Sequence, residues 1–440
     1  MARSGDWVTP RLWGEPWFEK PPLLYWMIAA GNLAGLGDDA APRLPVALMS
    51  VAFLLFYYRV LRSQFGAHAA ACSAAMLATC AGWVAFSQTG VPDLPMASAF
   101  SAAMLLGMRW LSTGDRRMTV AAAALLGLAV LAKGLVPLVL AIPLFFLSRK
   151  RWREWLRPLP AFTFLLIAIP WYLLCGLRHG AAFLQEFFGR HHFDRFTSGE
   201  TLHPEPFWFY LPVLAAAVFP WSPLLAGLLR KHLYRDLPRR FLLLWLAFGL
   251  LFFSASAGKL PGYLLPLIPA LTALLGLVLA EARKAEWYLG SSVLLLAAAP
   301  VAGHVLPQAL AAGLSRSDIA GWNWRLAALC VALAVAVWIL ERSERRVAAG
   351  ALTLAAAVAA ILWLKAAVLP EIDRLATARP LWKQAAPRVS DVCVGDVPRS
   401  LRYGLNYYSD ARLPDCGDDP RRWRIERTSG GAPVMTGGMR

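Results

Sequence analysis

The chain has 440 residues, of which 58% are hydrophobic and 16% charged, and its formal net charge is +17. Long apolar blocks recur from about residue 43 to residue 368, and such a chain cannot hide its apolar surface in one water-soluble core. The composition therefore predicts a polytopic membrane protein and excludes a soluble globular domain. Lys and Arg stand in short clusters between the apolar blocks without a nucleic-acid motif, so we expect no nucleic-acid partner.

The first apolar run follows a charged pair in the stretch GEPWFEKPPLLYWMIAAG, residues 14–31. The run covers residues 23–36, and its length of about 14 residues favours an interfacial or re-entrant helix over a span. Pro21 and Pro22 suit the start of such a helix. Glu19 and Lys20 are therefore expected at the outer membrane surface, where a lipid headgroup also lies.

Membrane topology follows from the basic clusters, because Lys and Arg concentrate on the cytoplasmic side of spans of about 20 residues. The predicted spans are 43–61, 69–86, 95–111, 159–177, 206–229, 240–257, 263–280, 287–307, 324–340 and 348–368. The segments expected outside are 1–42, 87–94, 178–205, 258–262, 308–323 and 369–440. The segment 119–147 lies between two basic clusters, so it must return to its own side. It is expected to form two short helices that meet at Lys133 and Gly134.

The region from about residue 370 is less apolar. Runs of β type at Asp391 to Gly395 and at Tyr407-Tyr408, around a possible helix, predict a small α/β appendage. Cys393 and Cys416 could form a disulfide if this region is extracytoplasmic. The predicted domains are an extracytoplasmic first loop at 1–42, a transmembrane helical domain at 43–369 and a small extracytoplasmic domain at 370–440.

Charged residues near apolar segments are costly and therefore informative. Asp93, in QTGVPDLPMAS, suits either a helix N-cap or a carboxylate that faces an outward cavity. Lys133, in LAKGLVP, suits either an ammonium that reaches the interface or a cation for a phosphate. Lys259 and Tyr263, in SASAGKLPGYLLPLIP, allow the same two interpretations. They are either part of the pocket or an ordinary loop lysine and interfacial tyrosine without a function.

The stretch FFGRHHFDRFTSGETLHPEPFWFYLP is the densest in polar and aromatic side chains. Its polar residues are His191, His192, Asp194, Arg195, Glu200 and His203. Their types permit a divalent metal, but their spacing matches no closed zinc set, and histidines of a surface loop are the alternative.

These polar residues are expected to surround one outward-facing pocket at the level of the lipid headgroups. Cations there suit a phosphate leaving group, and carboxylates suit the activation of an acceptor hydroxyl. The predicted set is Glu19, Lys20, Asp93, Lys133, His192, Arg195 and Lys259.

Several motifs of the first 280 residues resemble one group of bacterial membrane enzymes in sequence and in order. The motifs are SGDWVTPRLWGEPWFEKPPLLYW, VPDLPMA, LAKG, HHFDRF with HPEPFWFYLP, and GKLPGYLLPLIPAL. They resemble the lipid A aminoarabinose transferases and the protein O-mannosyltransferases, which have the GT-C architecture. The resemblance implies an all-α polytopic protein with about 12 membrane segments in the bacterial inner membrane, with a site that faces the periplasm.

The resemblance also implies a reaction. In these relatives a sugar on a polyprenyl phosphate such as undecaprenyl phosphate passes, with inversion, to a lipid, glycan or protein acceptor outside the membrane. Asp93 matches the second acidic residue of the cavity and is the predicted catalytic residue. The predicted ligands of the donor phosphate are Lys20, Lys133, Lys259, Tyr263 and Arg195. Glu19 and His192 match residues near a metal, which predicts a divalent ion such as Zn²⁺ or Mg²⁺.

The chain departs from this family at its start. In the family, an acidic pair just upstream of the SGDW segment supplies the proposed base and follows a first transmembrane helix. Met1 stands immediately before ARSGDW, so we expect a truncated or mis-assigned start or an inactive paralogue. A flippase, transporter or ligase of lipid-linked glycans is the alternative from another functional class.

Overall fold

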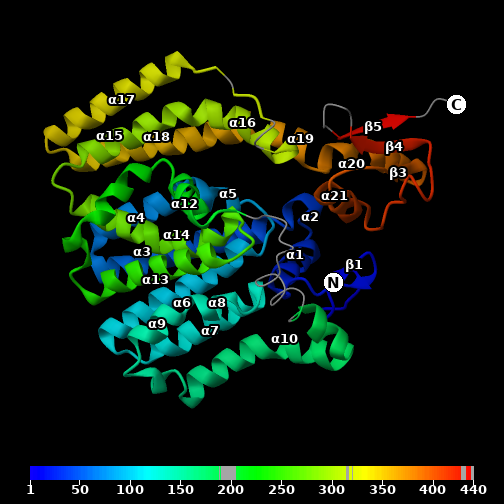
Figure 1. Cartoon of the computed structure of the whole chain (residues 1–440), viewed down its shortest axis with the longest axis horizontal. Coiled ribbons are helices and arrows are strands. Elements are labelled where there is room, and N and C mark those ends of the chain that lie inside the picture. The colour runs from blue at the N-terminus through cyan, green and yellow to red at the C-terminus, as the bar shows by residue number, and fades with distance from the viewer. Residues whose placement is uncertain (188, 190–204, 314–316, 320, 428–432, 438–440) are drawn as a thin grey trace. The chain divides into compact units, whose positions relative to one another are not determined.

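The structure is a computed structural model that describes residues 1–187, 189, 205–313, 317–319, 321–427 and 433–437. It divides into two compact units, Met1–Ser292 and Val293–Arg440, and each is described by itself (Figure 1). The predicted domain divisions after residues 42 and 369 stay predictions.

The first unit is mostly helical. Its α-helices are α1 (Leu23–Leu33), α2 (Gly37–Ala40), α3 (Leu44–Phe65), α4 (Ala67–Thr79), α5 (Ala81–Phe86), α6 (Asp93–Thr113), α7 (Arg117–Lys133), α8 (Val136–Leu140), α9 (Ile142–Leu147), α10 (Pro158–Leu184), α12 (Tyr210–Ala217), α13 (Leu237–Ala255) and α14 (Ile268–Ala280). Its 3-10 helices are η1 (Trp152–Glu154), η3 (Phe207–Phe209), η4 (Ser222–Leu229), η5 (Lys231–Tyr234) and η6 (Pro261–Leu267). A two-residue hairpin, β1 (Arg11–Leu12) with β2 (Glu15–Pro16), lies near the N-terminus.

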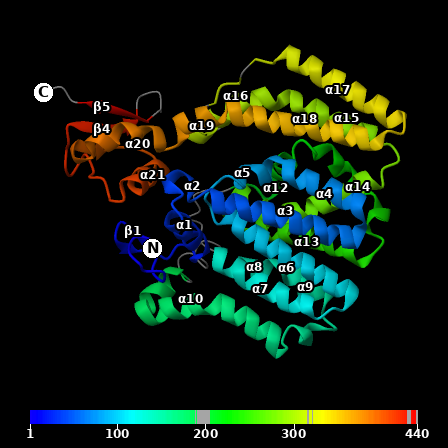
Figure 2. The ribbon, with the colours of Figure 1, turned by 180° about the vertical axis from the view of Figure 1, so that it is seen from behind.

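Helices α6 and α14 form the centre of this unit. In the most apolar stretch of the span Asp93–Thr113, 89% of the residues are buried, and in Pro261–Ala280 the share is 83%. In Pro158–Phe187 only 22% of the corresponding stretch is buried. Helices α6 and α7 run antiparallel and pack along each other, and α10 packs on α7 (Figure 2). The start of α6 and the end of α7 therefore lie at the same end of the helix pair.

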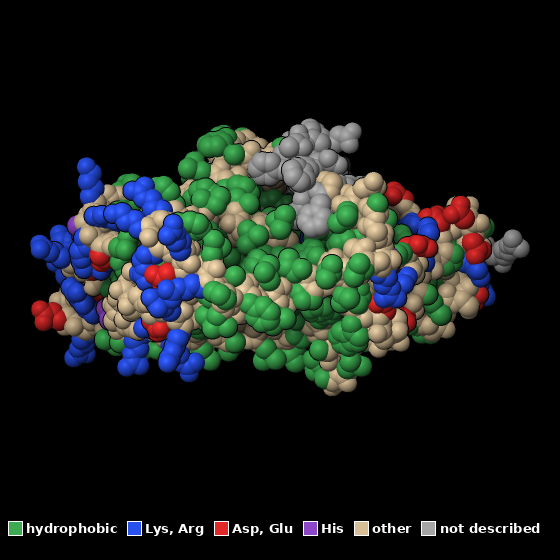
Figure 3. All heavy atoms as spheres, turned by 90° about the horizontal axis from the view of Figure 1, so that it is seen from below, with side chains coloured by type: hydrophobic (Ala, Val, Ile, Leu, Met, Phe, Trp, Pro, Cys, Tyr) green, Lys and Arg blue, Asp and Glu red, His purple; other side chains and the backbone are tan. Residues whose placement is uncertain are grey.

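Eight helices of the described residues are long and apolar enough to cross a membrane. They are Gly37–Phe65, Asp93–Thr113, Pro158–Phe187, Leu237–Ala255, Pro261–Ala280, Glu286–Ala311, Trp324–Arg342 and Arg346–Ala376. The number is nine if one bent helix pair counts as a span, and the described residues also form the shorter apolar helices Leu23–Leu33, Ala67–Thr79 and Val136–Leu147. On the face that Figure 3 draws, hydrophobic side chains form a broad band with Lys and Arg beside it, as at a lipid-facing surface.

Two of the predicted spans are interrupted, so their prediction as continuous helices is wrong. The span 69–86 breaks at Cys80 into α4 and α5, and the span 206–229 bends by 119° between α12 and η4. The Ala81 N–H donates to the Phe219 carbonyl over 2.9 Å, and the Trp221 indole N–H donates to the Thr79 hydroxyl over 2.9 Å. Each break therefore supplies hydrogen-bond partners to the other, which is how a non-helical point is tolerated inside a membrane protein.

The predicted break at Lys133 and Gly134 is confirmed. Helix α7 ends at Lys133, and Gly134 has a φ of +76°, which a residue with a Cβ rarely adopts. The chain then continues through α8 and α9. The return of 119–147 to one membrane side stays a prediction.

The second unit begins within α15 (Glu286–Leu295). Its further helices are η7 (Leu296–Ala298), α16 (Ala299–Ala312), α17 (Trp324–Arg342), α18 (Arg346–Ala367), α19 (Leu369–Ala376), α20 (Arg379–Ala385), η9 (Ala386–Asp391) and α21 (Arg399–Ser409). Its strands are β3 (Val392–Val394), β4 (Trp423–Arg427) and β5 (Pro433–Gly437), with β3 parallel and β5 antiparallel to the central β4.

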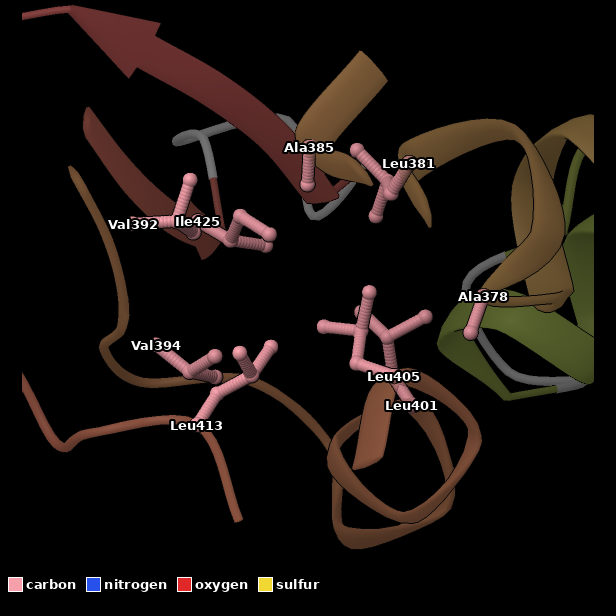
Figure 4. Close-up of a cluster of buried hydrophobic side chains, with 9 residues drawn as sticks. All are labelled: Ala378, Leu381, Ala385, Val392, Val394, Leu401, Leu405, Leu413 and Ile425. Carbon is pink, nitrogen blue, oxygen red and sulfur yellow. The ribbon is translucent and has the colours of Figure 1, made fainter. Parts of the chain in front are cut away.

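The predicted α/β appendage is confirmed, and it has its own apolar core. Side chains from the sheet, α20 and α21 point toward one another (Figure 4). The β run at Tyr407-Tyr408 is wrong, because both residues lie in α21, whose buried Leu401 and Leu405 are one helical turn apart. Cys393 and Cys416 form a disulfide, which suits an extracytoplasmic compartment.

Candidate active site

Asp93 and Lys133 form the centre of the candidate site. The Lys133 ammonium Nζ donates to Asp93 Oδ1 over 2.6 Å, and the two side chains are only 14% and 17% exposed. Asp93 is the first residue of α6 and Lys133 the last of α7. The antiparallel packing of these helices therefore joins two residues that are 40 positions apart.

Asp93 does not act as the N-cap of α6. Pro92 occupies the N-cap position of α6, and no side chain caps this helix end through a hydrogen bond. The Asp93 carboxylate instead pairs with Lys133 across the two helices. Its position in the first turn still gains from the helix dipole, which favours a negative charge there.

Tyr263 completes this cluster. The Lys133 ammonium lies 4.9 Å from the centre of the Tyr263 ring, a distance typical of a cation–π contact. The neighbouring Gly262 is placed where a Cβ would lie 2.8 Å from Phe86 Cζ and 3.3 Å from Asp93 Oδ1. A residue without a side chain therefore lets η6 approach both the carboxylate and the end of α5.

Glu19 and Lys20 lie beside the same end of α7. Phe18 is buried in one apolar cluster with Leu131, which stands two positions before Lys133. Lys20 Nζ donates to Glu19 Oε1 over 3.0 Å, and both side chains are about one quarter exposed, at 25% and 27%.

Lys259 makes its hydrogen bonds to residues outside the cluster of Asp93, Lys133 and Tyr263. Its side chain is buried, and its ammonium donates to the Ser256 carbonyl over 2.7 Å and to the Glu205 carbonyl over 2.9 Å. The structure therefore brings together Asp93, Lys133 and Tyr263, and it places Lys259 in a loop that leads to Tyr263.

His192 and Arg195 lie outside the described residues, so their predicted roles stay predictions. Among the described residues, no three His, Cys, Asp or Glu side chains come together as ligands for a metal ion. Glu19 forms an ion pair with Lys20. The described residues alone do not complete a site for a divalent ion, so the predicted metal depends on His192, and we route no chemistry through it.

Asp6 is a polar residue of this unit that the sequence did not single out. Its Oδ1 accepts hydrogen bonds from the Val8 and Thr9 N–H groups at 3.1 Å and from Arg178 Nη1 at 2.8 Å. Desolvation raises the pKa of Asp6, but the N–H donors of Thr9 and Val8 and the Arg178 charge outweigh it and hold the pKa below its usual value. An Asp before a turn can be recognised in the sequence, whereas its partner Arg178 in α10 cannot.

The chain is similar to several known proteins. The family described as dolichyl-phosphate-mannose-protein mannosyltransferase matches residues 19–184. An undecaprenyl phosphate-alpha-4-amino-4-deoxy-L-arabinose arabinosyl transferase of Pseudomonas aeruginosa is 36% identical over 310 residues, which are 67% of this chain and 55% of the relative. The crystal structure of ArnT from Cupriavidus metallidurans bound to undecaprenyl phosphate has a TM-score of 0.73 and 27% identity, and covers 94% of this chain and 78% of that chain.

The chain is similar to aminoarabinose transferases and has the GT-C fold. It spans about half the length of the curated relatives it matches, at 55% for the Pseudomonas aeruginosa relative and 50% for a transferase of Pseudomonas fluorescens that is 33% identical over 64% of this chain. The apolar helices and the likeness to ArnT make it a multi-pass protein of the bacterial inner membrane, with the candidate site facing the periplasm.

Proposed function

We propose that this protein is an inverting glycosyltransferase that moves a sugar from undecaprenyl phosphate, a polyprenyl carrier, to a lipid or glycan acceptor at the periplasmic side. The observation that carries the proposal is the Asp93–Lys133 ion pair of 2.6 Å beneath the Tyr263 ring. A carboxylate and an ammonium at one point suit a reaction that removes a hydroxyl proton and releases a phosphate.

Lys133 has two roles in this proposal. Without a donor, its ammonium is engaged by Asp93. A donor phosphate competes for the same ammonium, because an ammonium forms charge-assisted hydrogen bonds to phosphate as it does to a carboxylate. Donor binding then leaves the Asp93 carboxylate open to accept a proton.

The transfer itself is one displacement. The acceptor hydroxyl gives its proton to Asp93, and its oxygen bonds to the anomeric carbon on the face opposite the phosphate. The bond from this carbon to the phosphate oxygen breaks, and the electron pair leaves with the carrier phosphate. Lys133 and Lys20 offset the added negative charge, with Arg195 as a further proposed ligand.

A divalent metal is a separate part of the proposal. Glu19 and His192 are the residues proposed to contact a Zn²⁺ or Mg²⁺ ion near the phosphate. Its test is the metal content of the purified protein, compared between the wild type and Glu19→Gln.

The transfer assay tests the function directly. Purified protein is incubated with undecaprenyl phosphate-α-4-amino-4-deoxy-L-arabinose and lipid A, and the acceptor mass is followed. We expect Asp93→Asn to slow the transfer by about a hundredfold or more, as for the loss of an acid–base group.

Asp115→Asn is the matched control, because Asp115 is exposed in the connection at the opposite end of α6 and α7. It should transfer at the wild-type rate. A wild-type rate for Asp93→Asn as well would overturn the assignment of Asp93 as the base.

A further inference from the structure

Lys259 is a buried cation whose described partners are both neutral. Its side chain is 6% exposed, and its ammonium donates to the carbonyl oxygens of Ser256 and Glu205 at 2.7 and 2.9 Å. In the described part of the chain, no carboxylate forms an ion pair with it. Burying an ammonium is unfavourable unless it is paired and hydrogen-bonded, so an apolar side chain at this position would lower the desolvation cost. The hydrogen bonds that Lys259 donates are therefore its most informative feature.

These two hydrogen bonds join segments that are far apart in the sequence. Ser256 directly follows the end of α13, and Glu205 stands two residues before η3, which leads into α12. The hydroxyl of the buried Tyr210 donates to the Leu260 carbonyl over 3.2 Å, which links the same two segments a second time. The loop 256–260 is therefore fixed to the segment 205–210 at two points.

This loop leads directly into the candidate site. Leu260 precedes η6, and Tyr263 lies in the first turn of η6 with its ring 4.9 Å from the Lys133 ammonium. The Phe253 ring lies between the two segments, with its centre 5.6 Å from the Tyr263 ring and 6.3 Å from the Tyr210 ring. A shift of the loop would therefore move Tyr263 away from Lys133.

We propose that Lys259 is a positioning residue, which ties the loop 256–260 to the segment 205–210 and thereby holds Tyr263 over Lys133. This inference rests on the proposed glycosyl transfer, and it replaces the expectation that Lys259 itself binds the donor phosphate. What Lys259 supplies is two N–H donors to carbonyl oxygens. Its charge is not required for this role.

Two substitutions separate the hydrogen bonds from the charge. Lys259→Met keeps the length of the side chain and removes both the donors and the charge, whereas Lys259→Gln restores donors without a charge. We expect Lys259→Met to lower kcat by about tenfold or more, because small displacements in an active site are costly for the rate. Lys259→Gln should recover a large part of that loss. The Kd for undecaprenyl phosphate should stay within about threefold of the wild type in both variants, while Lys133→Met should raise it by about tenfold.

Hydrogen exchange tests the same link without any transfer. Lys259→Met should speed amide exchange in residues 206–212 and 260–266, and Lys259→Gln should restore protection. Lys284→Met is the matched control, because Lys284 is exposed, and it should leave exchange in both segments unchanged.

Equal losses of kcat and of undecaprenyl phosphate affinity in both Lys259 variants, with unchanged exchange, would overturn the positioning role and make Lys259 a phosphate ligand. If the wild type binds no undecaprenyl phosphate, the proposed function fails. The exchange experiment still decides whether Lys259 holds the loop.

Discussion

Asp93 and Lys133 each lie at the helix end that favours their charge. A carboxylate gains from the N-terminal first turn of a helix and an ammonium from the C-terminal last turn. Both side chains are mostly buried, so their ion pair is screened less than an exposed one. The pair therefore holds the two groups in place, and in the proposed function both of their chemical roles depend on this one contact.

Gly262 is the residue that lets η6 approach this pair. A Cβ there would lie 2.8 Å from Phe86 Cζ, so Gly262→Ala forces the ring or η6 to move. We expect a loss of about 1–3 kcal/mol of stability, as for other overpacked sites, and a transfer rate lower by about tenfold. The melting temperature and the transfer rate are the measurements.

Gly176→Ala is the control for this substitution. Gly176 lies in α10, and apart from its chain neighbours and the backbone of its own helix no atom lies within 4 Å of a Cβ at this position. Ala is the better helix former, so this variant should be at least as stable as the wild type. Equal behaviour of both alanine variants would contradict the tight approach at Gly262.

Asp93 and Lys133 could be singled out from the sequence as candidate site residues, because charges inside apolar segments are rare. The contacts of the buried Lys259 could not be predicted, because one of its partners, Glu205, is 54 positions away and belongs to another segment. For the same reason the partner of Asp6, Arg178, was invisible, since 172 positions separate them.

The N-terminal segment is held on α10 by several polar contacts. Besides the Asp6–Arg178 pair, the Trp171 indole N–H donates to the Val8 carbonyl over 2.8 Å, and Thr9 Oγ1 lies 2.9 Å from His179 Nε2. These contacts place the start of the chain beside Phe18 and the end of α7, since Phe18 and Trp171 share one apolar cluster. The segment therefore supports the position of Glu19 and Lys20.

The charge of Asp6 makes this support dependent on pH. Its pKa is lowered in the folded state, so its stabilising effect is present above its unfolded value of about 3.9 and is lost as the pH falls through the folded value. Asp6→Asn should cost about 1–2 kcal/mol at pH 7.

Thermal unfolding between pH 7 and pH 3 measures this dependence. The difference in melting temperature between the wild type and Asp6→Asn should shrink as the pH falls below about 4. A difference that is constant over this range would show that the Asp6 charge is not what stabilises the segment.

The positions of most helices could be predicted from the lengths of the apolar blocks. The breaks at Cys80 and near Phe219 could not, because their polar groups are satisfied by each other across 2.9 Å rather than along the chain. A hydropathy pattern reports how apolar a segment is, and it does not report which segments cross.

The whole molecule combines a helical membrane unit with a second unit that ends in a small extracytoplasmic fold. The appendage has its own core of residues from β3, β4, α20 and α21 and its own disulfide between Cys393 and Cys416. A disulfide is typical of an oxidising compartment, and the candidate site faces the same side in the predicted topology. The appendage is therefore expected to lie in the periplasm.

The central claim is that Lys133 exchanges Asp93 for the phosphate of a polyprenyl carrier. The binding of undecaprenyl phosphate to the purified wild type, Lys133→Met and the exposed-site control Lys150→Met tests this claim most directly. We expect saturable binding to the wild type and the control, and affinity lower by about tenfold in Lys133→Met, because the phosphate loses a charge-assisted partner. No saturable binding to the wild type, or equal affinity in all three proteins, would contradict the claim.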